Sequence, residues 1–458
     1  MQARYLLFFL CTLMLSCNSN SELQESPVII IGGGLMGSST AWQLARQGQP
    51  VLLIEKQDSI YTEGSSLGEA RIARSSNRGN DIWSYLHNRS VQEVSALIDY
   101  LNSTGAEETY QMEDIYTTSP VSYVGRTSIY DKLMASLIRQ EVEYEIAINP
   151  QEGEEKFDVL LPEDILLQRE YNLHSGTINP KVLIEYLHAA IKQKGNTILY
   201  NQKVSNLQLN PQTNLFELEL VNEKTGATQQ MKAQKVVSAA GPYTGQLLSD
   251  VAPYMDTLIK PQRVFLAYFK IQDAVYQQLP KTHQEKLKSF YPVINSSTGT
   301  RMGSFFSMIE YYDDQQQPVI KVGGHFQRSM IDDLDQVWKK ELSPEEIEWS
   351  QSSTARYLKL LKLPIEKDQL VLVNGYSCVY SLTNSEVPFV SPIMGEDRAP
   401  NPNFIMLGGM SGVGGKGAMS YGLIAANLLT GTNTEQDSLY QVSAKALGFE
   451  RLVEDVYH

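Results

Sequence analysis

VIIIGGGLMG (residues 28–37) is followed by SSTAWQLARQG and then by VLLIE, which ends on Glu55. An apolar run that ends in glycines, continues as an amphipathic stretch and returns to an apolar run predicts a strand, a tight turn, a helix and a second strand. In such a unit Gly32 permits the turn, Gly34 lets backbone N–H groups approach a pyrophosphate, and Gly37 lets the helix pack on the strand. The helix N-terminus favours phosphate, and the Glu55 carboxylate can accept hydrogen bonds from ribose hydroxyls. The stretch therefore predicts a dinucleotide site.

The composition is that of a globular protein with a large core. The chain has 458 residues, of which 42% are hydrophobic and 20% are charged. This length fits two domains or one large divided domain. The formal net charge is −14, without a block of lysine and arginine. Nucleic acid is not an expected partner, because phosphate contacts need a basic footprint.

The N-terminal segment has the pattern of an export signal. Arg4 precedes the apolar run YLLFFLCTLML, which is too short to span a bilayer, and Ser16-Cys17 then leads into polar residues. We expect a signal peptide over residues 1–17 and a linker over 18–26. Cys17 after Met-Leu-Ser resembles a bacterial lipobox, which implies a lipid anchor on a bacterial membrane, either periplasmic or at the cell surface. A simple cleaved signal peptide and an uncleaved anchor are the alternatives.

Strand-like segments such as KVVSAA, VIKVGG and FIMLGG recur along the chain and alternate with some helical patterns, which predicts an α/β fold. The stretch 256–371 is richer in aromatic residues, and we expect it to form a second, mixed-sheet α+β domain that shapes a substrate pocket. Residues 101–169 are expected to join this substrate domain. A discontinuous, Rossmann-like nucleotide domain is then expected from 27–100, 170–255 and 372–445.

Two glycine-rich stretches outside the first turn carry cationic residues. Residues 61–74 contain a glycine- and serine-rich segment followed by Arg71 and Arg74, whose spacing can place both guanidinium groups on one side of a helical turn. The alternative is a solvated basic turn. Residues 408–429 lead through glycines and Lys416 into an apolar helix, whose N-terminus would face an anion. The alternative here is a glycine-rich connection with an exposed lysine.

Three single residues also stand out. Lys321 interrupts an apolar strand, where a lysine usually faces solvent, and His325 follows four residues later. A histidine at such a place is more often a satisfied core or surface residue than a catalytic one. Cys378 is alone outside the leader, so no disulfide is available within the folded body, and a lone cysteine is usually a small buried apolar side chain. No metal site is expected.

Taken in order, these motifs resemble the monomeric sarcosine oxidase and N-methyltryptophan oxidase family of FAD-dependent amine oxidoreductases, which is related to D-amino acid oxidase. The resemblance covers most of residues 27–435. The matching segments are IGGGLMG with Glu55, TEGSSLGEARIAR, SGTINPKVLIEYL, VVSAAGPYTGQLL, KPQRVFLAYF, CVYSLTNSEVPFV and GGMSGVGGKG. The resemblance implies that the nucleotide domain binds FAD.

The resemblance also implies catalytic roles for four residues. Arg74 and Lys416 fall on the pair that binds the substrate carboxylate. Lys321 falls on the lysine held over the flavin face where oxygen reacts, and a cation there favours the anion that develops as oxygen is reduced. His325 falls on a pocket histidine.

Cofactor contacts follow from the same resemblance. Cys378 falls on the cysteine that attaches to FAD as a thioether, so the FAD is expected to be covalent, and Arg71 falls on an arginine beside the flavin ring. The other implied contacts are Gly32, Gly34, Leu35, Met36, Gly37, Glu55, Lys56, Gly64, Ser65, Ser66, Val204, Ala240, Gly241, Gly412, Gly414, Gly415 and Lys416.

Two departures from the family affect the pocket. Val413 stands where a histidine or another larger residue is usual, and Gly415 stands where an aromatic is usual, so we do not expect a pocket shaped for sarcosine itself. We expect an FAD-dependent oxidase of a secondary amino acid, N-alkyl or cyclic, that yields an imine and hydrogen peroxide with molecular oxygen as acceptor. The alternatives are a membrane-tethered dehydrogenase that passes electrons to a quinone or carrier, and a non-catalytic binding lipoprotein on a retained flavin fold.

Overall fold

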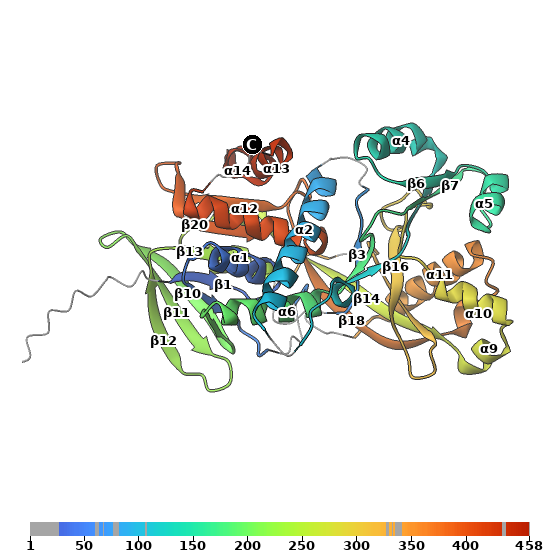
Figure 1. The fold of residues 1–458 in the computed structure, drawn as a ribbon, viewed down its shortest axis with the longest axis horizontal. Coiled ribbons are helices and arrows are strands. Elements are labelled where there is room, and N and C mark those ends of the chain that lie inside the picture. Colours follow the sequence, from blue (N-terminus) through green and yellow to red (C-terminus); the bar gives the residue numbers. More distant parts are fainter. Residues whose placement is uncertain are drawn as a thin grey trace, which may run out of the picture.

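The computed structural model describes residues 27–59, 64–66, 68–76, 82–105, 108–326, 329–331, 333–334, 341–432 and 437–457. The expected signal peptide and linker lie outside the described residues. None of the helices within these ranges is long and apolar enough to cross a membrane. Two lobes lie side by side along the longest axis of the molecule (Figure 1).

A six-stranded sheet forms the first lobe, with the strand order β19-β20-β13-β1-β2-β9. Its central strands pair in parallel, with Ile29 opposite Leu52, and all their residues are buried. Strands buried on both faces read as continuous apolar runs, which explains VIII and VLLI. The strands are β1 (Val28–Ile31), β2 (Val51–Ile54), β9 (Thr197–Leu199), β13 (Val236–Ser238), β19 (Phe389–Met394) and β20 (Pro400–Gly408).

Alternate residues of β1 contribute to two different cores. Ile30 packs with α1 (Leu35–Arg46), α6 (Pro180–Gln193) and α12 (Ala418–Thr430) on one face of the sheet. Ile29 packs on the other face with a three-stranded antiparallel sheet (Figure 1). That sheet comprises β10 (Gln202–Asn210), β11 (Leu215–Asn222) and β12 (Thr228–Ala233).

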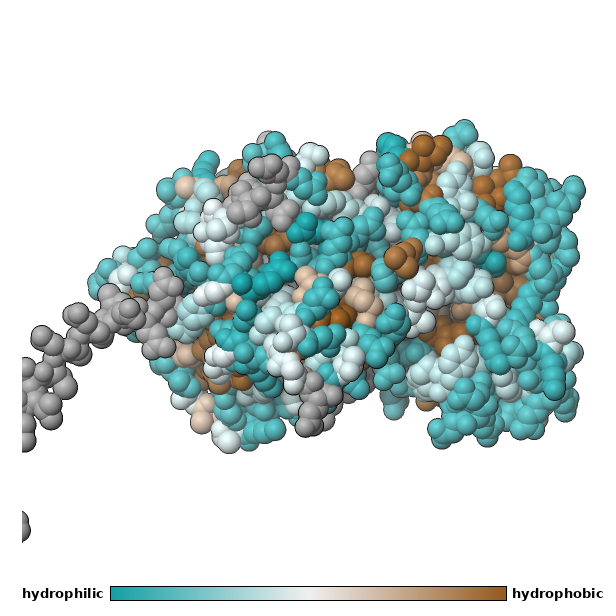
Figure 2. All heavy atoms as spheres, in the orientation of Figure 1, coloured by the Kyte–Doolittle hydropathy of each residue, from teal (hydrophilic) through white to brown (hydrophobic). Residues whose placement is uncertain are grey.

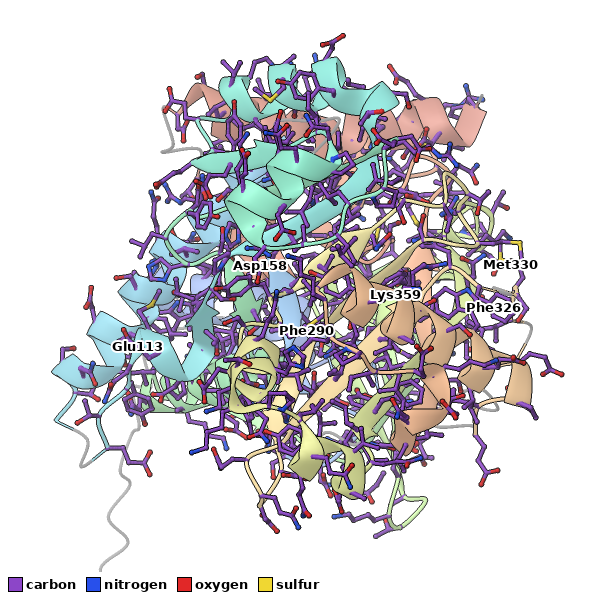
Figure 3. The ribbon with its side chains drawn as sticks, turned by 90° about the vertical axis from the view of Figure 1, so that its right-hand side faces the viewer. Glu113, Asp158, Phe290, Phe326, Met330 and Lys359 are labelled. Atoms are coloured by element: carbon purple, nitrogen blue, oxygen red, sulfur yellow. The ribbon has the colours of Figure 1, made fainter. Side chains whose placement is uncertain are left out.

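The second lobe is built on an eight-stranded sheet with the order β18-β14-β17-β16-β15-β5-β7-β6. Ile320 and Val322 of β17 face the core beneath α11 (Pro344–Leu360), where Phe290, labelled in Figure 3, meets Tyr357 edge-on at 5.1 Å between ring centroids. The intervening Lys321 therefore points to the opposite face of the sheet. The strands are β5 (Val121–Arg126), β6 (Tyr144–Ala147), β7 (Ile165–Glu170), β14 (Lys260–Ile271), β15 (Val293–Asn295), β16 (Phe305–Tyr312), β17 (Pro318–Gly324) and β18 (Leu370–Leu382).

Strand β18 crosses a domain boundary that we expected at residue 372. It pairs with β14 along its length, with Cys378 opposite Val264, so residues 372–382 belong to the eight-stranded sheet rather than to the nucleotide sheet. The cause is a long-range pairing between strands more than a hundred residues apart, which local periodicity does not reveal. Helix α11 begins at Pro344, with Ser343 as its N-cap.

A small sheet joins the two lobes, with β8 (Gly176–Ile178) between β3 (Arg71–Ala73) and β4 (Tyr116–Thr118). Arg71 pairs with Ile178 across this sheet. The helical turn that we expected at Arg71 and Arg74 is therefore wrong, because pairing with β8 holds this segment extended.

The remaining helices lie around the two lobes, and mostly hydrophilic side chains cover the face seen in Figure 2, with hydrophobic ones in scattered groups. These remaining helices are α2 (Ile82–Ser103), α3 (Met112–Ile115), α4 (Tyr130–Arg139), α5 (Pro150–Phe157), α7 (Thr244–Leu247), α8 (Met255–Leu258), α9 (Asp273–Gln278), α10 (Lys281–Lys288), α13 (Ser438–Leu447) and α14 (Phe449–Tyr457).

Candidate functional site

A cavity of about 710 Å³ lies where the nucleotide sheet meets the eight-stranded sheet. One end is bounded by the β1–α1 turn and by the end of β2 at Glu55. The other end is bounded by the 412–416 loop and by Phe306 and Met308 of β16. Segments from most of the chain therefore converge on one elongated site.

The glycine turn is shaped by close packing. Gly32 has φ +98°, and a Cβ there would lie 2.5 Å from the carbonyl oxygen of Ala239, so no other residue fits. A Cβ on Gly37 would lie 1.8 Å from the carbonyl oxygen of Gly32, which is the tight helix–strand contact that this motif requires. Gly34, at the N-cap of α1, lines the cavity, and a Cβ there would meet only Ser66 Oγ, at 3.2 Å.

The Glu55 side chain is fixed at the end of β2. Its Oε2 accepts a hydrogen bond from the Gly33 N–H at 2.7 Å, and its Oε1 accepts one from the Gln57 N–H at 2.8 Å. Burial raises the pKa of this carboxyl above its usual value. Each carboxylate oxygen has a second lone pair, so the group can still accept from a ribose hydroxyl. The neighbouring Lys56 donates to the Tyr243 hydroxyl at 3.1 Å.

Arg74 and Lys416 lie together on the cavity wall. Lys416 is almost fully buried, and burial together with the charge of Arg74 lowers its pKa to about 7, partly opposed by Glu170. The Glu170 carboxylate accepts from the N–H groups of Ser75 at 2.8 Å and Ser76 at 2.9 Å, which fixes the backbone directly after Arg74. Two cations that repel each other on a cavity wall can be stabilised by an anion such as a carboxylate.

A neutral histidine that sequence reasoning missed lies behind this pair. His87 of α2 is fully buried, and burial followed by the charge of Lys416 lowers its pKa to about 3. The imidazole therefore adds no positive charge beside Lys416. A single histidine within an amphipathic helix gives no local signal of this role.

Lys321 is fully buried, so the usual solvent-facing reading of a lysine in a strand is wrong here. Its Nζ donates to the carbonyl oxygen of Ala70 and forms an ion pair with Glu310. Burial and the nearby Arg71 lower the pKa of Lys321 to about 7, and Glu310 opposes this. Met308 is its cross-strand partner and lines the cavity, so Lys321 lies just beneath the wall.

Cys378 is also buried just behind the wall. It shares a face of β18 with Tyr380, two residues on, which lines the cavity. Burial raises the pKa of the thiol, and the Arg71 charge and a hydrogen bond with Ser65 oppose this. Both of these neighbours line the cavity, so the sulfur lies one side chain away from it.

A polar cluster lies on the wall farther out. Arg301 Nε donates to His325 Nδ1 at 3.3 Å, and the Arg301 guanidinium forms an ion pair with Glu386. All three residues line the cavity, while the Arg301 and Glu386 side chains are 61% and 51% exposed, so this end opens to solvent. Sequence reasoning selected His325 and missed its two partners, which come from separate loops.

Most of the residues implied by the family resemblance line this one cavity, and so does Val413. Gly37, Lys321 and Cys378 lie behind the wall instead. The residues on the wall are Gly32, Gly34, Leu35, Met36, Glu55, Lys56, Gly64, Ser65, Ser66, Arg71, Arg74, Val204, Ala240, Gly241, His325, Gly412, Gly414, Gly415 and Lys416.

The donor set fits FAD. The glycine turn at the N-terminus of α1 suits a pyrophosphate, and Glu55 suits a ribose. The cavity continues without interruption to Arg71 and to the glycine loop before α12, where a flavin ring would lie between the two lobes.

Comparison with known proteins agrees with this geometry. Residues 27–428 match the family described as FAD dependent oxidoreductase (DAO). The chain is 23% identical to monomeric sarcosine oxidase of Bacillus sp. (strain B-0618) over 253 residues, or 54% of this chain and 59% of that protein, which is less than two thirds of the relative's length. It is 23% identical to monomeric sarcosine oxidase of Bacillus sp. (strain NS-129) over 424 residues, or 92% of this chain and 97% of that protein.

A solved structure shows the same fold. NikD, described as an unusual amino acid oxidase essential for nikkomycin biosynthesis, aligns with a TM-score of 0.67 at 18% identity. The alignment covers 90% of this chain and 96% of that one. The two-lobed arrangement of a nucleotide sheet and a larger mixed sheet is therefore shared.

Proposed function

The chain belongs to the DAO family of FAD-dependent oxidoreductases, and from this premise we propose that it oxidises a secondary amino acid, N-alkyl or cyclic, to an imine. The observation that carries this proposal is the pairing of Arg74 and Lys416 on the wall of a cavity whose other end is a nucleotide cradle. The similarity to sarcosine oxidases supports amino-acid oxidation as the reaction class. The substrate side chain would extend toward Arg301 and His325.

The chain's own residues orient the substrate. Bound FAD supplies the acceptor for a hydride equivalent from the carbon next to the amine. Arg74 and Lys416 hold the carboxylate by charge-assisted hydrogen bonds, which fixes the C–H bond toward the ring. A bound carboxylate also restores the proton on Lys416, because an opposite charge favours the charged form of a lysine. Val413 and Gly415 leave more room beside the ring than the residues usual in the family.

The acceptor side of the reaction involves Lys321. We infer that its ammonium group stabilises the negative charge that develops as molecular oxygen is reduced to hydrogen peroxide. Its position just beneath the wall, on the Met308 face of the large sheet, supports this role.

We also infer that Cys378 is the point of covalent attachment of FAD. The support is the position of its sulfur, one side chain behind the wall and next to Ser65 and Arg71. After acid precipitation the yellow colour should stay with the polypeptide, and in a Cys378→Ser variant it should pass into the supernatant. Release of all colour from the wild-type protein would exclude the thioether.

A dehydrogenase is the second candidate, and one observation favours it. The charge of Lys321 is paired with Glu310 and is not in contact with the cavity, so it is less available to molecular oxygen than a free ammonium group would be. In this case a quinone or carrier at a bacterial membrane would take the electrons, and the lipobox-like Cys17 would tether the enzyme there. Turnover under air compared with turnover under an artificial acceptor distinguishes the two.

The test of the proposed function is an anaerobic screen. The purified holoprotein is mixed with sarcosine, N-methyl amino acids, proline, pipecolate and glycated amino acids, and the visible flavin absorbance is followed. Bleaching by at least one secondary amino acid, and none by the matching amine without a carboxylate, is the expected result. If every amino acid leaves the absorbance unchanged, the proposal is wrong.

A further inference from the structure

Glu310 lies at a break in the pairing of β16 and β17. Met308 pairs with Lys321 and Ile309 with Ile320, but Tyr311 then pairs with Val319, so Glu310 is an extra residue on its strand. Such a β-bulge leaves one residue outside the ladder and redirects its side chain. The carboxylate freed in this way lies against the ammonium group of Lys321.

Glu310 and Lys321 together hold the loop that leads into β3. Glu310 Oε1 accepts a hydrogen bond from the Glu69 N–H at 2.8 Å, while Lys321 Nζ donates to the carbonyl oxygen of Ala70. One ion pair of the large sheet thus engages two consecutive residues of a loop whose Ser65 and Ser66 line the cavity.

Gly68 makes this contact possible. It has φ +106°, and a Cβ there would lie 2.9 Å from Arg71 Nη1 and 3.1 Å from Glu310 Oε1. Any other residue would be strained at this φ, and its Cβ would crowd both side chains. The Arg71 guanidinium, which lines the cavity, is therefore packed directly against the same cluster.

The charges in this cluster depend on one another. The Glu310 and Lys321 side chains are 4% and 0% exposed, and a buried ion costs several kcal/mol unless it is paired. Arg71 is a second cation near Lys321. The single carboxylate of Glu310 therefore interacts with two positive charges, those of Lys321 and Arg71.

The other groups near the ammonium do not replace this carboxylate. The carboxylate of Glu69 belongs to an exposed residue, and the Tyr268 and Tyr376 hydroxyls bond to each other at 2.8 Å and stay protonated because burial raises the pKa of both. Without Glu310, burial and Arg71 would act on the lysine with little opposition.

We propose that Glu310 is a positioning residue: it keeps Lys321 charged beneath the cavity wall and joins the flavin-side loop to the large sheet. This inference rests on the proposed function in one respect, namely that Lys321 assists the reduction of oxygen. The pairing itself is a property of the chain and can be measured separately.

The first test is thermal unfolding of the holoprotein between pH 5 and pH 9. In Glu310→Gln the pKa of Lys321 falls below that of the wild type. At a pH between these two pKa values, Lys321 is protonated in the folded wild type and deprotonated in the folded variant. Its deficit in Tm relative to the wild type should therefore be largest at acidic pH and shrink as the pH rises toward about 7. The double variant Glu310→Gln/Lys321→Met has no lysine to titrate, so its deficit should stay constant up to about pH 7. Above that pH its deficit should grow, because the wild type gains stability there as Lys321 loses its proton in the folded state but not in the unfolded state.

The second test is reoxidation by air of flavin that has been reduced with dithionite, which needs no amine substrate. Glu310→Gln should react about fivefold more slowly than the wild type at pH 7, as expected when the pKa of the lysine falls by one unit and its charged fraction drops from about a half to about a tenth. The rate should recover at lower pH. Glu310→Asp should keep most of the rate. Glu217→Gln, which removes an exposed ion pair with Lys232, is the control and should match the wild type.

Two results would overturn the inference. One is a Glu310→Gln variant whose Tm deficit is the same at every pH from pH 5 to pH 9. The other is a reoxidation rate with the wild-type pH profile. Because neither readout uses an amine, both remain interpretable if no amino acid bleaches the flavin and the proposed function itself is wrong.

Discussion

At the scale of single residues, two lysines with similar surroundings have different tasks. Lys321 and Lys416 are both buried beside an arginine, and in both burial lowers the pKa to about 7. Lys321 is paired with the Glu310 carboxylate, whereas Lys416 lines the cavity beside Arg74, where we propose that a substrate carboxylate binds. Burial therefore opposes the charge of both lysines, and a carboxylate of the chain itself offsets this for Lys321, whereas we propose that the carboxylate of a ligand does so for Lys416.

The surroundings of Lys416 predict a pH dependence of carboxylate binding. Its pKa in the folded protein is lowered to about 7, so the free enzyme carries the charge below that pH and loses it above. The Kd of a simple carboxylic acid without an amine should rise by up to about tenfold per pH unit above pH 7. Titration of the flavin absorbance with the acid between pH 6 and pH 9 measures this.

Lys416→Arg is the matched comparison for this titration, because a guanidinium stays charged throughout the range. Its Kd should change much less with pH than that of the wild type. A wild-type Kd that is constant from pH 6 to pH 9 would show that Lys416 does not titrate at the site.

At the scale of elements, local motifs were predicted correctly and long-range pairings were not. The β1–α1 turn follows from glycine spacing and apolar runs, because every contact that it needs lies within a few residues. The extended conformation at Arg71 depends on pairing with β8, and the freedom of Glu310 depends on a bulge against β17. Neither pairing produces a pattern in the neighbouring sequence. The conformation at Arg71 was therefore predicted wrongly, and the bulge at Glu310 was missed.

The turn supplies an element-scale prediction. Gly37→Ala places a methyl group 1.8 Å from the carbonyl oxygen of Gly32, so α1 must move away from β1. We expect a loss of about 1–3 kcal/mol in stability, as for other overpacked sites, and a preparation with less bound flavin. Tm and the ratio of visible to ultraviolet absorbance measure the two effects.

Gly48→Ala, just beyond the end of the same helix, is the control. Its φ of +81° carries a moderate strain, but no atom lies within 4 Å of the added Cβ. The variant should lose some stability and keep its flavin. Equal flavin contents in both variants would contradict the packing role of Gly37.

At the scale of the whole molecule, the site exists because two sheets meet. The nucleotide sheet supplies the glycine turn and Glu55, and the large sheet supplies Met308, Lys321 and the strand that carries Cys378. Most of the site residues predicted from motif order and family resemblance line the cavity, although they make up fewer than half of its lining residues. Motif order and family resemblance did not reveal the Arg301–Glu386 ion pair farther out on that wall or His87 behind it, because those contacts come from segments without a motif.

The central claim is that Arg74 and Lys416 hold an amino-acid carboxylate while the bound flavin is reduced. Its most direct test is the anaerobic rate of flavin bleaching by the best secondary amino acid, measured for the wild type, Arg74→Ala and the control Arg126→Ala, whose half-exposed side chain pairs with Asp164. We predict that Arg74→Ala loses about 2–4 kcal/mol of substrate binding, on the order of 30- to 1000-fold in the bleaching rate at low substrate, with Arg126→Ala unchanged. Bleaching by Arg74→Ala at the wild-type rate would contradict the claim.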